Sequence, residues 1–342
     1  MNRPKVEKGL VIGSFDPLHL GHLFVFAFAR EAAQQVSILV LETDTDLVPI
    51  QKRFEWLKEE FPTATIIKMK IAERPESEED FKSFAKLVIT ANGKFDAVIG
   101  SDEMAYRVAT QMDAKQIFPL QESVSSDSVQ AKIQPFDNWK FLPACVKGYL
   151  TIKVCLFGPE CTGKTKMARE LARHFNTVFV EEYARSYFEM KDNEVQAEEV
   201  SDIAIGQLAS EDFLARSSQQ VLFCDTDLIS TTIWCKWMYE DKCPEWVRME
   251  AERRQYDLYL LMDIDVPWQD DSVRCLPNNR KEFFADCKEA LDTRGRKYIT
   301  ISGPFEDRFA NAVSAVEDLL RQKKKKLTYE IKRPSISDLG SS

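Results

Sequence analysis

Two segments of this sequence combine glycines with residue types that hold phosphate groups. One runs from Gly13 to His22 and reads GSFDPLHLGH, and the other runs from Gly158 to Thr165 and reads GPECTGKT. Glycine lets the backbone approach an anion closely, and the N–H groups at the start of a helix attract negative charge. Both segments therefore predict sites for phosphorylated ligands.

The second segment fits the pattern G-x-x-x-x-G-K-[ST] at every position. The hydrophobic run IKVCLF precedes it and apolar residues at helical spacing follow it, so a strand, a loop and a helix succeed one another as phosphate binding requires. In such a loop Lys164 reaches the β- and γ-phosphates of ATP, and the Thr165 hydroxyl is a ligand of Mg²⁺. The predicted ATP-binding residues are Gly158, Glu160, Cys161, Thr162, Gly163, Lys164 and Thr165.

Acidic residues at other strand ends have to distinguish a kinase from an ATPase or a GTPase, because all three share this loop. Glu182 lies in the run VFVEEYAR, and Asp225 and Asp227 end the run VLFCDTD. Ligands bind at the carboxyl ends of parallel strands, where one carboxylate can orient an attacking hydroxyl while another holds the metal. The alternative is that these carboxylates are solvated surface groups.

A later polar segment, DVPWQDDSVR, carries Asp270 and Arg274, and Arg280 follows it. One hypothesis is a closing segment whose guanidinium groups neutralise a transferring phosphoryl group. The other is an exposed loop with incidental charge, and spacing alone does not separate the two.

The first segment holds two of the three histidines in the chain, His19 and His22. On a turn that enters a helix, both can face one anion, and histidine offers hydrogen bonds and a positive charge near neutral pH. This suits a triphosphate and the charge that develops on its α-phosphate. Gly13, Ser14 and Phe15 form the predicted turn. A metal site is the rival interpretation, but a third ligand at a suitable spacing is missing.

Both motifs need a strand that ends at the loop and a helix that begins after it, and the sequence repeats this pattern. Four hydrophobic runs before residue 150 are LVIGSF, VSILVLE, ATIIKMKI and FDAVIGSD, and five after it are IKVCLFG, TVFVEEY, QVLFCDTD, YDLYLLMDID and RKYITISG. Alternating strands and helices predict parallel sheets covered on both faces. We therefore predict an α/β chain with two tandem doubly wound parallel-sheet domains, residues 1–147 and 148–322, followed by a basic, disordered tail, residues 323–342.

Composition excludes several classes of protein. The chain has 342 residues, 44% of them hydrophobic and 30% charged, which excludes a small disulfide-stapled module and a wholly disordered chain. A net charge of -9 argues against nucleic acid as the main partner. No run approaches the roughly 20 apolar residues of a membrane span, and no signal peptide is recognisable. We expect a cytoplasmic protein with no membrane partner; a homo-oligomer is left open.

All eight cysteines lie at or after position 145, and none forms a C-x-x-C pair. Several stand in hydrophobic runs, so buried free thiols in a reducing compartment explain them better than disulfides or a zinc site.

The first motif resembles the GxFxPxHxGH signature of the nucleotidyltransferase superfamily. Together with it, several segments in order resemble the bifunctional NMN adenylyltransferase/ribosylnicotinamide kinase family of bacterial NAD salvage, up to about Leu320: QKRFEWLKEEF, FDAVIGSDE, GPECTGKT, EEYAR, DTD, DVPWQDDSVR and ISGPFEDRF. The resemblance implies a nucleotidyltransferase Rossmann-like domain that adenylates NMN to NAD, followed by a P-loop kinase domain that phosphorylates nicotinamide riboside to NMN. Both steps would use ATP, and the kinase step would also use Mg²⁺.

The same resemblance assigns roles to residues. The catalytic set would be His19, His22, Lys164, Glu182, Asp225 and Arg274. Thr165 and Asp225 would hold Mg²⁺, and Asp270 and Arg274 would belong to the closing segment. Some family members carry an N-terminal helix-turn-helix repressor domain; only nine residues precede the first strand here, so we expect no DNA-binding role.

The sequence departs from the family in one phosphate-binding motif, which resembles I-S-x-T-x-x-R. Ser125 is kept, but Asp127 stands where a hydroxyl is expected and Gln130 replaces the arginine. Losing a charged hydrogen bond to phosphate costs about 1.5–3 kcal/mol, so we expect a weakened adenylyltransferase beside an intact kinase. Two alternatives stay open: a kinase for another nucleoside, and a first domain that is a catalytically silent nucleotide sensor.

Overall fold

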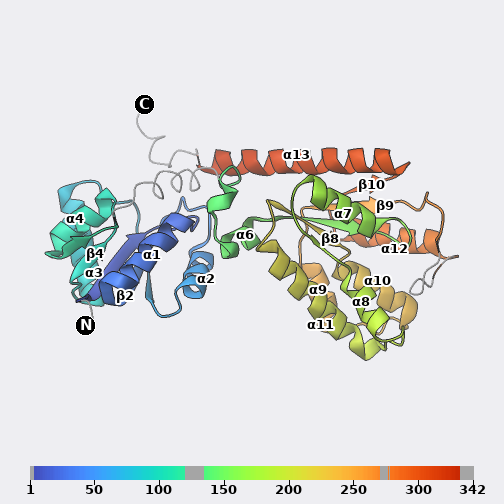
Figure 1. The fold of residues 1–342 in the computed structure, drawn as a ribbon, viewed down its shortest axis with the longest axis horizontal. Coiled ribbons are helices and arrows are strands. Elements are labelled where there is room, and N and C mark those ends of the chain that lie inside the picture. The colour runs from blue at the N-terminus through green and yellow to red at the C-terminus, as the bar shows by residue number, and fades with distance from the viewer. Residues whose placement is uncertain (1–3, 120–134, 270–275, 277, 332–342) are drawn as a thin grey trace. The chain divides into compact units, whose positions relative to one another are not determined.

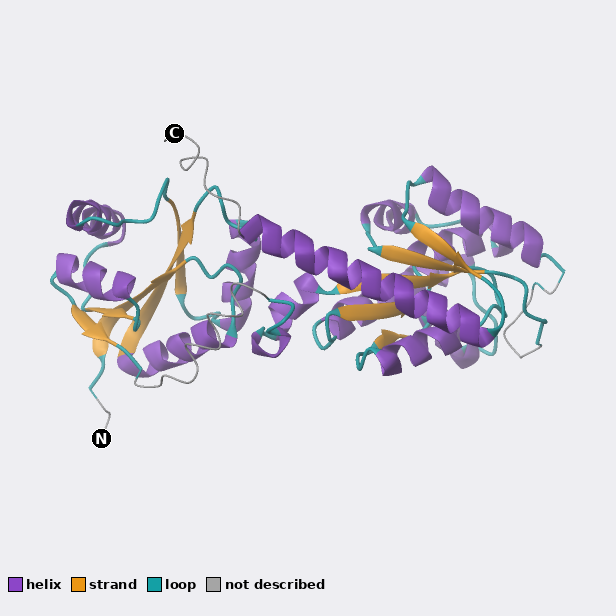
Figure 2. Cartoon of the chain, turned by 90° about the horizontal axis from the view of Figure 1, so that it is seen from above, coloured by secondary structure: helices purple, strands orange, loops and turns teal. Residues whose placement is uncertain are grey.

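The computed structural model describes residues 4–119, 135–269, 276 and 278–331 (Figure 1). They form two compact units, of which the first comprises the residues up to Val146 and those from Lys326 on, and the second comprises Lys147–Lys325. Each unit contains one five-stranded sheet in which every neighbouring pair of strands is parallel. Helices lie on both faces of each sheet (Figure 2). The predicted class, α/β with two doubly wound parallel sheets in tandem, is confirmed.

The first unit has the strand order β3-β2-β1-β4-β5. Its elements are β1 (Val6–Gly13), α1 (Leu20–Ala32), β2 (Ala33–Glu42), α2 (Ile50–Glu60), β3 (Thr65–Lys70), α3 (Glu78–Asn92), β4 (Ala97–Ile99), α4 (Glu103–Met112), β5 (Lys115–Ile117) and the short helix η1 (Trp139–Phe141). Helix α6 (Ala144–Leu150) spans the boundary to the second unit. The chain builds outward from β1 and then returns to β4 on its other side. The loop after β1 therefore leaves the sheet where the strand order reverses, the usual ligand position in such folds.

All four strands predicted in the first unit are present, and β5 is additional. Its sequence, Lys-Gln-Ile, contains no hydrophobic run because an edge strand is buried on fewer sides. The core between the sheet and α3 and α4 is apolar, with Leu10, Leu39, Val88 and Val108 all fully buried. This core fixes the end of β1, where the first motif begins.

The second unit has the strand order β10-β9-β6-β8-β7. Its elements are β6 (Ile152–Phe157), α7 (Lys164–His174), β7 (Phe179–Val180), α8 (Tyr183–Met190), η2 (Ala197–Glu199), α9 (Val200–Ala215), β8 (Val221–Asp225), α10 (Leu228–Met238), α11 (Glu245–Arg253), β9 (Leu258–Met262), α12 (Arg280–Thr293), β10 (Tyr298–Ile301) and α13 (Phe305–Ile331). All five predicted strands are present. β6 is central, so the loop that follows it again leaves the sheet at a reversal of strand order.

Helix α13 continues to Ile331 and so includes residues 323–331, which the sequence predicts as the start of a disordered tail. Lysine, leucine and glutamate are good helix formers, and Lys323 pairs with Asp257 at 2.5 Å. Residues 332–342 lie outside the described residues. In the described part of the chain, no helix has the length and apolar content needed to cross a membrane.

The core of the second unit surrounds Phe283 of α12, whose ring lies 4.6 Å from that of Trp234 and 5.8 Å from that of Trp237. Three free cysteines, Cys155, Cys224 and Cys287, are fully buried in the same core. Burial raises the pKa of each of these thiols. They act as small apolar core groups.

Two aspartates at the end of β8, Asp225 and Asp227, have different surroundings. Thr226 has a φ of +74° and turns the chain between them. Asp227 then caps α10, because its carboxylate accepts the Ser230 N–H at 3.0 Å and the Tyr259 hydroxyl at 2.8 Å. Burial raises the pKa of Asp227 to about 6. Asp227 is therefore an anchor for the turn that carries Asp225.

Phe283→Ala should lower the free energy of unfolding by about 3–5 kcal/mol, because it removes a fully buried ring without refilling the space. Chemical denaturation measures the loss. Phe213→Ala is the matched control, since that ring is 72% exposed and its removal should change stability by less than about 0.5 kcal/mol. Equal effects of the two substitutions would contradict this packing.

Asp227→Asn should change how stability depends on pH. The folded protein holds a proton on Asp227 up to a pKa of about 6, whereas the ordinary pKa of the group is 3.8. Its contribution to stability is therefore fully present below pH 3.8 and is lost as the pH rises through 6, by roughly 3 kcal/mol. Denaturation of both proteins between pH 4 and 8 should show the variant gaining relative stability across that window, and parallel curves would refute it.

Candidate nucleotide sites

The loop between β6 and α7 uses backbone conformations that favour glycine. Gly158 and Gly163 have φ values of +130° and +86°. A Cβ at Gly158 would lie 2.9 Å from the Met262 carbonyl oxygen, so no larger residue fits there. The Lys164 ammonium donates to the carbonyls of Gly158 at 3.0 Å and Pro159 at 2.9 Å. The predicted lysine thus lies across the loop that begins its helix.

Arg308 of α13 holds this loop from behind. Its side chain is almost fully buried and donates to the carbonyls of Thr162 at 3.1 Å and Asp263 at 3.1 Å, while it also pairs with Asp265. The sequence motif ISGPFEDRF contains Arg308, but spacing gave it no role. Only the fold brings it to Thr162, which lies 146 residues earlier in the chain.

Arg280, the first residue of α12, makes a second connection to the loop. It donates to the carbonyls of Cys161 at 3.3 Å and Val266 at 2.9 Å. The thiol of Cys161 accepts the Gln269 N–H at 2.9 Å. The segment after β9 is therefore attached to the loop by both Cys161 and Arg280.

Asp225 and Thr165 come together as the sequence predicts. The Thr165 hydroxyl donates a short hydrogen bond to one oxygen of the fully buried Asp225 carboxylate. The other oxygen, Oδ1, is buried and has no hydrogen-bond partner among the residues described. Burial and the neighbouring Glu182 raise the pKa of Asp225 to about 7, against the opposing effects of Lys164 and the Thr165 hydroxyl. An unpartnered carboxylate oxygen beside a phosphate-binding loop is suited to a cation.

A cavity of about 620 Å³ opens beside the loop. The loop and the start of α7 line it, and Glu182 and Arg185 contribute to the lining as well. Its apolar lining residues include Phe188, Val200, Ile203, Trp234, Met238 and Tyr239. The site therefore offers both charged groups and apolar surface to a ligand.

The first motif brings His19 and His22 into contact. His19 is the N-cap of α1, and each Nδ1 accepts the backbone N–H of the other residue, at 3.3 and 3.2 Å. The two rings stack with centroids 3.5 Å apart. Because Nδ1 accepts a hydrogen bond in both rings, a neutral imidazole carries its hydrogen on Nε2. The pair thus has two Nε2–H donors, as anion binding needs.

Buried Arg53 of α2 fixes the turn between Gly13 and His19. Its side chain is fully buried and donates to the Ser14 carbonyl at 2.5 Å, and it pairs with Asp46 at 2.6 Å. Asp16 of the motif accepts the backbone N–H groups of Leu47 and Val48, at 2.7 and 2.9 Å. The sequence prediction missed Arg53, although an arginine within the helical run QKRFEWLKEEF was the available signal.

Phe15 has a φ of +52° and its ring packs edge-on against His22 with centroids 5.0 Å apart. The Ser14 hydroxyl accepts a hydrogen bond from Arg74 at 3.0 Å. Ser125, Asp127, Gln130, Asp270 and Arg274 lie outside the described residues. Their predicted roles stay predictions.

Comparison with known families matches each unit separately. The family model described as "Cytidylyltransferase-like" matches residues 10–83, which include the His19–His22 turn and Arg53. The model described as "AAA domain" matches residues 153–308, which run from β6 to Arg308. Each match therefore includes one of the two glycine-containing motifs.

Curated relatives span nearly the whole chain. The trifunctional NAD biosynthesis/regulator protein NadR of Escherichia coli (strain K12) is 26% identical, over 94% of this chain and 85% of that protein. Its namesake from Salmonella typhimurium (strain LT2) is 25% identical, over 93% and 85%.

Two crystal structures of NadR protein, one in complex with NAD and AMP-PNP and one in complex with NR, share the fold. Their TM-scores are 0.69 and 0.70 at 23% and 22% identity, and each comparison covers 92% of this chain and 96% of that one. Both family models, both relatives and the fold agree with the motifs of the sequence. The chain is thus similar over nearly its whole length to NadR, with a cytidylyltransferase-like match in the first unit and an AAA domain match in the second.

Proposed function

We propose that the chain makes NAD from nicotinamide riboside in two ATP-dependent steps. The second unit phosphorylates the riboside to NMN, and the first transfers an adenylyl group from ATP to NMN, with release of pyrophosphate. One observation carries the proposal: the phosphate-binding loop, the buried Asp225 and the apolar cavity lie together in one unit. The relatives named for NAD biosynthesis and the structures with NAD, AMP-PNP and NR support these substrates. We keep residues 1–147 and 148–322 as the proposed domains.

The residues of the second unit fit a magnesium nucleotide. A side chain at Gly158 would collide with the Met262 carbonyl, Gly163 has a φ of +86°, and Asp225 Oδ1 has no hydrogen-bond partner in the described chain. Thr165 and Asp225 would hold Mg²⁺, and Lys164 would contact the phosphates. When bound, the ion supplies charge neutralisation at the phosphates. The described residues contain no group of three or more His, Cys, Asp or Glu that could hold a metal, as suits an ion bound largely by phosphates and water.

Phosphoryl transfer then depends on position and charge. The loop and Lys164 hold the phosphates at one end of the cavity, and the apolar end receives the pyridine ring of the riboside. Glu182 also lines this cavity, and its carboxylate can accept a hydrogen bond from the 5′-hydroxyl and orient its oxygen for in-line attack. No covalent intermediate with the protein is needed.

Adenylyl transfer would use the two histidines of the first unit. Their Nε2–H groups donate to the triphosphate, where they stabilise the charge that develops on the α-phosphate as the NMN phosphate attacks. Arg53 and Asp16 keep the turn in shape. Asp127 and Gln130 replace a hydroxyl and an arginine of the family motif, so we expect this step to be slower by roughly 10- to 150-fold than with the complete motif.

The same replacements favour a second candidate for the first unit, a nucleotide sensor without catalysis. Titration of the purified protein with NAD and NMN, combined with a pyrophosphate assay, separates the two. Binding without pyrophosphate release supports the sensor, and turnover excludes it.

Lys164→Ala should reduce NMN formation from nicotinamide riboside and ATP by at least about 10²-fold, because it removes the side-chain cation of the loop. The assay resolves NMN from NAD over time in the presence of Mg²⁺. Formation of NAD from added NMN should be unchanged. A wild-type protein that makes no NMN would refute the kinase proposal.

His22→Ala should show the opposite pattern. It removes one of the two proposed donors to the triphosphate and one half of the reciprocal His19–His22 cap, so NAD formation from added NMN and ATP should fall by about 10²-fold or more. NMN formation from the riboside should stay at the wild-type rate. Equal loss of both products would contradict separate sites.

A further inference from the structure

We propose that Gln207 is a positioning residue for the acceptor side of the kinase site. It holds the first turn of α8, and this turn carries Glu182 and Arg185 to the cavity. The inference rests on the proposed kinase function and adds to it a residue that contacts neither ATP nor the riboside. Two features of α9 support it, a buried polar network and a glycine contact.

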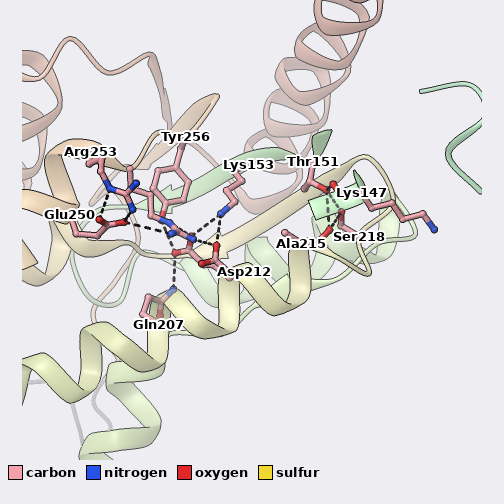
Figure 3. Close-up of polar contacts among 12 residues, drawn as sticks. Lys147, Thr151, Lys153, Gln207, Asp212, Ala215, Ser218, Glu250, Arg253 and Tyr256 are labelled. Carbon is pink, nitrogen blue, oxygen red and sulfur yellow. Dashed lines mark hydrogen bonds and ion pairs between the residues drawn. The ribbon is translucent and has the colours of Figure 1, made fainter. Parts of the chain in front are cut away.

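The network is centred on Glu211, which is fully buried in α9. Figure 3 shows three of its partners, Lys153, Gln207 and Tyr256. Its carboxylate accepts the Tyr256 hydroxyl at 2.6 Å, Arg254 Nε at 3.1 Å and Lys153 Nζ at 3.5 Å. Two cations thus compensate the buried charge. Because its partners come from β6 and from the segment before β9, Glu211 is tied to the sheet.

Glu211 in turn orients Gln207, one helical turn earlier. The Gln207 amide nitrogen donates to Glu211 at 3.4 Å, and its carbonyl oxygen accepts the Tyr183 backbone N–H at 3.1 Å. An amide has one donating and one accepting end, so the contact to Glu211 selects the end that faces α8. The side chain of Gln207 is 3% exposed, which limits competition from water.

The N–H of Tyr183 is one of the groups at a helix start that lack a partner within the helix. The N-cap residue, Glu182, makes no side-chain capping bond, as far as the described residues show. Gln207 therefore supplies an acceptor that a cap residue ordinarily gives. This leaves the Glu182 carboxylate to face the cavity, which it lines.

A glycine next to Gln207 receives the Tyr183 ring. A Cβ at Gly206 would lie 2.2–2.5 Å from three carbons of that ring, so the ring packs directly on the backbone of α9. Neighbouring residues of α9 thus hold Tyr183 by its main chain and by its ring. Glu182 and Arg185 flank Tyr183 along the chain. Both lie close enough to Asp225 to shift the pKa of its carboxyl, which Glu182 raises and Arg185 lowers.

The test uses the full chain with Gln207→Met, which keeps the length of the side chain and removes both hydrogen bonds. We expect kcat/KM for nicotinamide riboside to fall about 10- to 100-fold through misplacement of Glu182. The Kd for the ATP analogue AMP-PNP with Mg²⁺, measured by calorimetry, should stay within about twofold, since the loop is held by Arg308 and Arg280. Gly206→Ala should give the same pattern by displacing the ring.

Gln219→Met is the matched control, because Gln219 is exposed and the substitution is chemically identical. Its kinetics should equal those of the wild type. A parallel loss of AMP-PNP affinity and riboside turnover in Gln207→Met would overturn the proposal, since it would indicate general loss of structure. Unchanged riboside kinetics would overturn it as well.

Hydrogen exchange tests the contact between Gln207 and the Tyr183 N–H without any substrate. In Gln207→Met, the peptide spanning residues 181–187 should exchange faster while the peptide spanning the loop at 158–164 keeps its wild-type rate. Unchanged exchange at 181–187 would overturn the proposal. A wild-type protein without riboside kinase activity would instead refute the proposed function, and the exchange data would still decide whether Gln207 holds α8.

Discussion

A loop that turns its N–H groups toward a phosphate has to satisfy its carbonyl groups elsewhere. In both units of this protein, arginines supply those donors from behind the loop. Arg308 and Arg280 donate to the carbonyls of Thr162 and Cys161, and Arg53 donates to that of Ser14. Guanidinium suits this task because it carries five N–H donors in one plane and keeps its charge at all relevant pH values. The shape of each proposed nucleotide site depends on these contacts.

Ligand binding at these sites also depends on the charge around the loop. The whole chain carries a charge of -9, yet the cavity beside the loop is lined by lysine and arginine as well as by Glu182. Asp225 is fully buried next to that cationic group. Local charge therefore decides whether a polyanion can bind, and the net charge mainly governs long-range behaviour in solution. A negative net charge is therefore compatible with the binding of phosphorylated ligands.

Much of the fold could be predicted because its strands are buried on both faces and read as continuous hydrophobic runs. Nine strands were predicted from such runs, and all are present. β5 was not predicted, because its three residues lie at the edge of the sheet, where a strand needs little apolar character. Residues 323–331 were predicted as tail, yet they continue α13. In each case local composition was a weak guide because neighbouring structure supplies the missing stabilisation.

By itself the sequence determined the two phosphate-binding turns, because their chemistry needs glycine, lysine and histidine at fixed short spacings. The resemblance chose Asp225 over Asp227, but the spacing of the two residues gave no physical reason for the choice. The tertiary structure supplies that reason, since Thr226 turns the chain so that one carboxylate meets Thr165 and the other caps a helix. The roles of Arg53 and Arg308 were also decided there. Hydrogen bonds join residues that are far apart in sequence, and spacing along the chain carries no signal for them.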